Sequence, residues 1–332
     1  LLKAGAAVDA TEEDGWTALM FAAQNNHEKC LLALLKAGAA VDAAANNGFT
    51  ALMLSARTPE PKGFTALMLS CQNGHEQCAL ELLKAKADPN KANAEGSTAL
   101  ILAAQDGHEQ CALALIKAGA NVNAAEEDGW TALMQACDGG HEQCALALIK
   151  AGANVNYAKS NGFTALMLSC QNGHEQCALE LLKAGANVNH SINDGRTALM
   201  QAAKNGHEQC VLALIKAGAN VNATEEDDYT ALIFACQNGH EQCALELLKA
   251  KADPNKAADE GFTALIAAAQ DGHEQCALEL IKAGAAVDAT EQDGYTALMT
   301  ACKNGHEQCL LELLKAGAAV DATEEAGWTA LM

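Results

Sequence analysis

Positive charge is scarce in this chain of 332 residues. Asp and Glu number 42 against 21 Lys and Arg, so the formal net charge is −21. Nucleic acids and anionic membranes select for positive charge, and the imbalance therefore argues against both as direct partners. Long apolar runs are also missing. No stretch approaches the 18 consecutive apolar residues expected of a membrane-spanning helix.

Aromatic residues and prolines are few as well. Aromatics make up 4% of the chain and there are only four prolines, whereas half of all residues are apolar. This composition is typical of a folded chain with a core of alanine and leucine, and excludes a disordered one. Fourteen cysteines would suggest disulfides in a small secreted domain. Here they recur at fixed helical positions, so we expect reduced thiols in a cytoplasmic or nuclear protein.

What the chain does have is an internal repeat. The tripeptide Thr-Ala-Leu recurs at intervals of 33 residues, except that Thr50 and Thr65 are only 15 apart. An internal repeat overrides domain counting by length, so we predict one array over residues 1–332. It has nine full repeats, a partial repeat at each end and a 15-residue insertion at about 50–64. The tripeptide begins at Thr17, Thr50, Thr65, Thr98, Thr131, Thr164, Thr197, Thr230, Thr263, Thr296 and Thr329.

Each repeat predicts two short helices and a turn. In the repeat at Thr131, this threonine is a good N-cap for a first helix. The two glycines at 139–140 would end that helix. A second helix begins near His141 and carries an apolar stripe at helical spacing over 144–149. The following residues, 154–163, predict an extended, hairpin-like finger. Helices this short are marginal alone and must stack on neighbouring repeats.

The motifs of this repeat resemble those of the ankyrin family. Gly-x-Thr-x-Leu opens the first helix, Asn-Gly-His precedes the second and Leu-Leu-Lys-Ala-Gly-Ala-x-Val-Asn follows it. The resemblance covers essentially the whole chain. It implies an all-α solenoid of stacked helix-turn-helix units with hairpin-like fingers. It also implies a concave face made of fingers and first helices, and a protein that binds other proteins without catalysis.

The chain departs from the family pattern in three ways. The family's Thr-Pro-Leu-His becomes Thr-Ala-Leu-Met or Thr-Ala-Leu-Ile, which removes a helix-initiating proline and a locally bonding histidine. Lys86 and Lys251 replace the glycine that ends the second helix, and each costs about 1 kcal/mol if it remains left-handed. The insertion nearly duplicates a first helix, and its two prolines forbid a continuous helix. One copy must therefore lie outside the stack.

Two observations concern the origin and extent of the array. Residues 71–92 are identical to 236–257, five repeats later, which indicates a block duplication. The array also begins within a second helix and stops just inside a first helix. Repeat arrays need polar capping repeats. We therefore expect this chain to be a segment of a longer one.

Candidate metal and catalytic motifs favour a structural interpretation. Cys-x3-His-x2-Cys, as at Cys71, His75 and Cys78, offers zinc ligands, but the first cysteine is alanine in other repeats. Equivalent positions in neighbouring helices lie about 8–10 Å apart, too far for shared ligands or disulfides. His-Glu-Gln-Cys occurs eight times and lacks the second histidine of zinc proteases. We expect no catalytic residue, no cofactor and no metal ion, and a metal-binding array is a distant alternative.

The negative charge is concentrated in the fingers. The eleven residues before each Thr, with the insertion, contain 25 acidic and six basic residues. Solvated turns that keep the array soluble are one interpretation. Attraction toward a partner with a basic surface is the other.

Aromatic residues also occupy a fixed position. Nine of the twelve stand immediately before the Thr, at residues such as Trp130, Tyr229 and Tyr295. They either pack on the next finger or form a row of binding anchors. One variable position on the first helix would tune such a groove. The predicted partner-binding residues are Trp16, Trp130, Phe163, Arg196, Tyr229, Phe262, Tyr295, Gln135, Gln201 and Phe234.

Together these patterns predict a non-catalytic scaffold for protein–protein interaction. We expect a monomer that binds a protein partner through its finger and first-helix face, with no nucleic acid and no membrane involved. The alternative is a regulatory or targeting segment of a larger enzyme or channel chain. Sequence beyond these residues would distinguish the two.

Overall fold

A computed structural model describes residues 6–45 and 63–330 of the chain. The chain divides into two compact bodies, residues 1–160 and 161–332, which we call the N-terminal and C-terminal bodies. Throughout the described residues the regular structure is helical, with isolated bridges but no β-strand. The predicted all-α solenoid of helix-turn-helix units is confirmed.

Helices alternate in length along both bodies, with a first helix of seven or eight residues and a second of nine. The N-terminal body contains α1 (Ala18–Gln24), α2 (Glu28–Lys36), α3 (Ala66–Gln72), α4 (Glu76–Lys84), α5 (Ala99–Gln105), α6 (Glu109–Lys117), α7 (Ala132–Asp138) and α8 (Glu142–Lys150). The C-terminal body contains α9 (Ala165–Gln171), α10 (Glu175–Lys183), α11 (Ala198–Lys204), α12 (Glu208–Lys216), α13 (Ala231–Gln237), α14 (Glu241–Lys249), η3 (Asp259–Gly261), α15 (Ala264–Asp271), α16 (Glu274–Lys282), α17 (Ala297–Asn304) and α18 (Glu307–Lys315).

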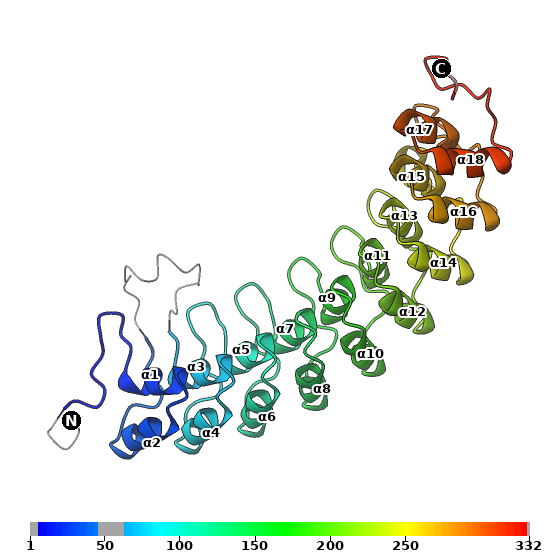
Figure 1. The fold of residues 1–332 in the computed structure, drawn as a ribbon. Helices are drawn as coiled ribbons and strands as arrows, with labels where there is room; N and C mark the ends of the chain where they lie inside the picture. Colours follow the sequence, from blue (N-terminus) through cyan, green and yellow to red (C-terminus); the bar gives the residue numbers. More distant parts are fainter. Residues whose placement is uncertain (1–5, 46–62, 331–332) are drawn as a thin grey trace. The chain divides into compact units, whose positions relative to one another are not determined.

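Within each body the helices form two rows (Figure 1). In the N-terminal body the first helices α1, α3, α5 and α7 pack on one another in that order, and so do the second helices α2, α4, α6 and α8. The C-terminal body repeats this arrangement from α9 and α10 to α17 and α18. The fingers project from the side of the first helices, so fingers and first helices share one surface of each body.

Threonine begins each first helix by capping it. The hydroxyl of Thr131 accepts a hydrogen bond from the backbone N–H of Met134 at 3.3 Å. Thr17 gains a second contact, because its backbone N–H donates to Sδ of Met20 at 3.5 Å. Thr197 and Met200 form the same pair at 3.4 Å. In these two repeats methionine sulfur accepts from the capping residue, where the family pattern has its locally bonding histidine.

Histidine is the N-cap residue of each second helix, but its side chain makes no capping hydrogen bond. His108 and His141 are N-cap residues with no side-chain bond to their own helices. Instead, Nε2 of His141 donates to the carbonyl oxygen of Gln105, 36 residues earlier, at 2.9 Å. Gly107 makes room for this ring, since a Cβ there would lie 2.4 Å from Nδ1 of His141. The same bond recurs within the C-terminal body, for example from His240 to the carbonyl of Lys204 at 3.0 Å, and it ties a repeat to the one before it.

Asparagines at the base of the fingers form a second link between repeats. The side-chain oxygen of Asn90 accepts from the backbone N–H of Asn121 at 2.6 Å, and its amide donates to the carbonyl of Gly119 at 3.3 Å. Asn123 accepts from Asn154 in the same way at 2.7 Å. Each asparagine thus satisfies backbone groups of the following repeat.

The core between the rows consists of small and medium apolar side chains. In the repeat at Thr131, Ala136, Ala145 and Leu148 have no exposed surface and Cys144 is 1% exposed. Alanine at such positions allows the two helices of a repeat and the helices of the next repeat to approach closely. The predicted stripe on the second helix therefore faces the stack, apart from Ile149, which is half-buried.

The finger that contains the insertion closes on the second copy of the repeated segment. The backbone N–H of Ala45 donates to the carbonyl of Phe64 at 3.0 Å, and Gly63 donates back to Ala45 at 3.1 Å. The helix α3 follows directly and packs on α1. The second copy thus enters the stack. The first copy and most of the predicted insertion fall on residues 46–62, outside the described residues.

Lys86 and Lys251 are left-handed, each with φ of 68°. We predict that Lys86→Gly and Lys251→Gly each stabilise the protein by about 1 kcal/mol, because glycine adopts this conformation without a clash at Cβ. The equivalent Gly119 offers the control, since its φ is 89° and a Cβ there would meet no atom within 4 Å. Gly119→Lys should destabilise the protein by a similar amount. Urea unfolding midpoints provide the measurement, and equal midpoints for all four proteins would contradict the prediction.

Deleting residues 50–64 should raise stability. Phe49 would then precede Thr65, and its carbonyl would replace that of Phe64 as the acceptor for Ala45. A shorter loop costs less closure entropy, and we expect a gain of about 1–2 kcal/mol. Differential scanning calorimetry of the deleted and intact chains tests this. An unchanged or lower melting temperature would refute the prediction.

Candidate functional site

The residue that precedes the capping threonine accepts a backbone hydrogen bond that closes the finger. In the finger before α7, the backbone N–H of Glu126 donates to the carbonyl of Trp130 at 2.9 Å, and Gly129 donates to Glu126 at 2.9 Å. Ala125 and Thr131 form an isolated antiparallel bridge. Neighbouring fingers are joined as well, because the N–H of Glu127 donates to the carbonyl of Glu95 at 3.1 Å. The aromatic position is therefore held at the junction of finger and first helix.

Rings at this junction pack on their own first helix and on the next finger. Tyr229 and Phe234 stack with centroids 5.3 Å apart, and Phe262 of the next repeat lies 6.2 Å from Tyr229. Trp16 and Phe21 form the equivalent pair in the N-terminal body at 5.2 Å. Such contacts stabilise the fingers as well as presenting a surface.

The ten predicted partner-binding residues differ in exposure. Three are buried, with exposed fractions of 7% for Trp16, 4% for Gln201 and 9% for Phe234, and offer little area to a partner. Gln201 and Phe234 occupy the variable position on the first helix. The residues at this position in later repeats, Ala267 and Thr300, are also buried. The other seven are half-buried: Trp130, Phe163, Arg196, Tyr229, Phe262, Tyr295 and Gln135.

The structure brings together the rings of Tyr229, Phe234 and Phe262. Gln135 joins a separate group in the N-terminal body, where its amide donates to the carboxylate of Glu126 at 3.5 Å. We use the term finger face for the surface that the fingers and first helices make in each body. All ten predicted residues belong to these elements.

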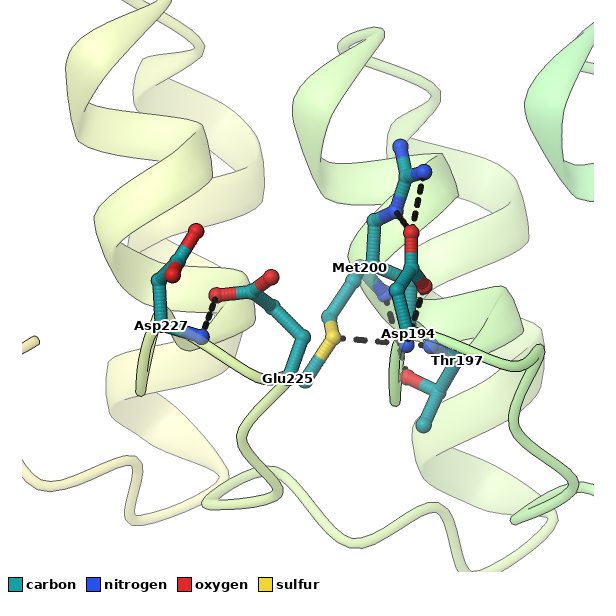
Figure 2. A network of polar contacts seen from close by, with 6 residues as sticks. Asp194, Thr197, Met200, Glu225 and Asp227 are labelled. Atoms are coloured by element: carbon teal, nitrogen blue, oxygen red, sulfur yellow. Dashed lines mark hydrogen bonds and ion pairs between the residues drawn. The ribbon is translucent and has the colours of Figure 1, made fainter.

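Arg196 pairs within its own finger with Asp194, which is labelled in Figure 2. Its Nε donates to the carboxylate of Asp194 at 2.7 Å, and a second guanidinium nitrogen contacts the same oxygen. The hydrogen bond from Arg196 lowers the pKa of Asp194, and the same bond raises the pKa of Arg196. The guanidinium of Arg196 is therefore already paired with a carboxylate of its own finger.

Some glutamate carboxylates of the fingers have a structural role that the sequence did not predict. Glu225 accepts from the backbone N–H of Asp227 at 3.0 Å and of Tyr229 at 3.1 Å. Glu291 makes the same two bonds, to Asp293 at 3.1 Å and to Tyr295 at 3.0 Å. The signal available in the sequence is a glutamate four residues before the aromatic. The remaining carboxylates of these fingers, which include Glu226 and Asp227, are exposed.

Lysine side chains lie over three of the aromatic rings. The Nζ of Lys159 is 4.1 Å from the centroid of Trp130. Lys303 lies 4.6 Å from Tyr295, and Lys204 lies 5.6 Å from Phe234. These are cation–π distances. The finger face therefore already holds ammonium groups on aromatic rings.

Three hollows open on the finger face of the C-terminal body. The first, of about 490 Å³, is lined by residues that include Asp194, Glu225 and Tyr229. The second, of about 480 Å³, includes Phe262 and Tyr295 in its lining. The third, of about 360 Å³, lies between Tyr295 and Trp328. These volumes lie within the range of about 300–1,000 Å³ that is typical of ligand clefts.

Some cysteines of neighbouring repeats form pairs that the sequence did not predict. None of the fourteen forms a disulfide, and twelve are buried. Cys71 on a first helix hydrogen bonds with Cys111 on the second helix of the next repeat. Cys236 and Cys276 form the same pair in the C-terminal body. Among the residues described, no three His, Cys, Asp or Glu side chains converge as metal ligands.

Buried thiols should react more slowly than exposed ones. Burial raises the pKa of Cys243 to about 12 and of Cys309 to about 11, and the pKa of Cys71 is raised by its bond to Cys111 and by burial. Cys30 is the exposed cysteine. We predict about one rapidly reacting thiol per folded chain with a chromogenic disulfide reagent at pH 8, because thiolates at the protein surface react first.

The control for this prediction is Cys30→Ser, which should abolish the rapid phase. In denaturant the wild-type chain should instead show all its thiols as rapidly reactive. Several rapid equivalents in the folded protein would show that the stack opens far more readily than its packing indicates.

No helix within the described residues has the length and apolar character needed to cross a membrane. This agrees with the absence of long apolar runs in the sequence.

Comparisons with known proteins agree with the helix pairs and fingers described above. The family described as "Ankyrin repeats (3 copies)" matches residues 1–62, 56–126, 123–192, 156–225, 189–258 and 265–332. A search of curated proteins found no match to the sequence. Among solved structures, the chain is similar to the crystal structure of the human ASB11 ankyrin repeat domain. The identity is 30% and the TM-score is 0.61, over 65% of this chain and 98% of that one. The chain belongs to the ankyrin repeat family.

Proposed function

We propose that this chain is a non-catalytic scaffold that binds a protein partner through its finger face. Ankyrin repeats are generally protein–protein interaction modules, and the family is typically non-enzymatic. The observation that carries the proposal is the alignment of half-buried rings with exposed carboxylates at the same place in successive repeats. Tyr229 and Tyr295, for example, each follow an acidic finger.

This combination suits recognition of a basic protein surface. Half-buried aromatic side chains supply contact area at low cost in conformational entropy, and they are frequent among residues that dominate binding. Exposed finger carboxylates such as Glu226 and Asp227 would speed encounter with a positively charged partner. Buried free thiols support a reducing compartment such as the cytoplasm or nucleus. The scaffold is proposed to act as a monomer.

The test uses the whole chain as bait for proteins of a cell lysate at low and at high salt. Specific partners should be retained at low salt and released at high salt, because exposed charges are screened. With a recovered partner, Trp130→Ala, Tyr229→Ala and Tyr295→Ala should each weaken binding about tenfold or more. Helicity measured by circular dichroism should change little.

Exposed leucines of the second helices provide the matched control. Leu113→Ala and Leu314→Ala also truncate large side chains, 40% exposed in both cases, on the opposite row of helices. These variants should bind like the wild type. If they weaken binding as much as the aromatic variants do, or if the aromatic variants lose their helicity, the proposed face is wrong.

A further inference from the structure

Two of the hollows in the C-terminal body are equivalent by repeat position. We call them the Tyr229 hollow, lined in part by Glu225, Asp227 and Tyr229, and the Tyr295 hollow, lined in part by Glu291, Asp293 and Tyr295. The second set lies 66 residues after the first, which is two repeats. Their volumes, about 490 and 480 Å³, are also alike. A ligand with two matching groups would find a glutamate, an aspartate and a tyrosine at equivalent positions in both hollows.

Negative charge dominates both hollows. Four carboxylates line the Tyr229 hollow against two cations, Arg196 and Lys204. Three carboxylates line the Tyr295 hollow against Lys303. Some of these carboxylates are engaged, since Asp194 pairs with Arg196 and Glu225 holds its finger turn. The excess nevertheless leaves each hollow suited to a further cationic group.

The chain's own lysines show how a cation is accommodated there. In the Tyr295 hollow, Lys303 lies 4.6 Å from the ring of Tyr295, which sits beside the finger carboxylates. In the Tyr229 hollow, Lys204 lies 5.6 Å from the ring of Phe234. Each hollow thus combines an aromatic face with carboxylates. Arginine suits this combination best, because its planar guanidinium stacks on a ring and pairs with a carboxylate.

The distance between the hollows limits the partner. Packed helices lie about 8–10 Å apart, so two repeats correspond to about 16–20 Å. An extended chain covers about 3.3–3.6 Å per residue. Two arginines of one extended strand would therefore reach both hollows when they are about five or six positions apart.

We propose that the Tyr229 and Tyr295 hollows bind two arginine side chains of a single extended, basic segment of the partner. This inference rests on the proposed function and names the chemistry of the partner. The segment crosses the fingers of the C-terminal body and inserts one guanidinium at every second repeat. Charge complementarity and the shared aromatic and carboxylate lining select this occupant over an acidic or apolar peptide.

The test measures fluorescence anisotropy of labelled peptides that carry two arginines two, six or twelve positions apart, joined by proline spacers that are semi-rigid and rise about 3.1 Å per residue. The whole chain is titrated at low salt. We expect the six-position peptide to bind about tenfold more tightly than the other two, since it alone engages both hollows at once. The peptide with two lysines should bind more weakly, and the peptide with two glutamates should not bind.

Paired substitutions then distinguish binding in the hollows from a general attraction to the negative surface. Glu226→Gln with Asp227→Asn at the first hollow, or Asp271→Asn with Asp293→Asn at the second, should remove the preference for six positions, because only one hollow remains. The control is Glu208→Gln with Glu241→Gln, an equal charge change at the starts of second helices. It should keep the preference, with affinity changed less than twofold.

Three outcomes would overturn the inference. Equal affinity for all three arginine spacings would show a diffuse attraction to a negative surface, as would equal losses in the hollow and control variants. Recovery of a partner that needs Tyr229 and Tyr295, while none of the peptides binds, would retain the proposed function and refute the arginine segment. A folded basic surface would then be the occupant.

Discussion

The structure depends on the packing of each repeat against the next. Helices of seven and nine residues are too short to persist alone, so every repeat draws its stability from its neighbours. The hydrogen bond from His141 to the carbonyl of Gln105 is a clear instance. It joins a helix start to the end of a helix 36 residues earlier, and Gly107 leaves the space for the ring. The asparagines at the finger bases act in parallel at the other end of the second helices.

This stacking decides what the fingers can do. Because neighbouring fingers share backbone hydrogen bonds, as between Glu226 and Asp194, their acidic and aromatic side chains recur at a constant position. Some of that chemistry serves the fold, since Glu225 holds its turn and Tyr229 packs on Phe234. The remaining carboxylates and ring faces are exposed to a partner. Structural and binding roles therefore coexist at the same repeat positions, and the aromatic rings contribute to both.

Much of the fold was predictable from one repeat. Thr131 caps its helix and the residues around His141 begin the next one, because caps and glycine turns act within a few residues. Lys86 and Lys251 stand where other repeats have the glycine that ends the second helix, and the structure shows that both are left-handed. Exposure within the candidate site was less predictable. Trp16 stands at the same position as the half-buried Trp130 but is 7% exposed, since its burial depends on what surrounds it.

The sequence by itself determined the repeat length, the helix ends, the family and the concentration of charge in the fingers. These follow from spacing and from interactions inside one repeat. Only the tertiary structure decided which side chains meet between repeats. Cys71 and Cys111 are 40 residues apart, and the ring of His108 bonds to the carbonyl of Gln72, 36 residues earlier. A hydrogen bond or ring contact of this kind depends on how adjacent helices are placed, and that placement arises only when the repeats pack together.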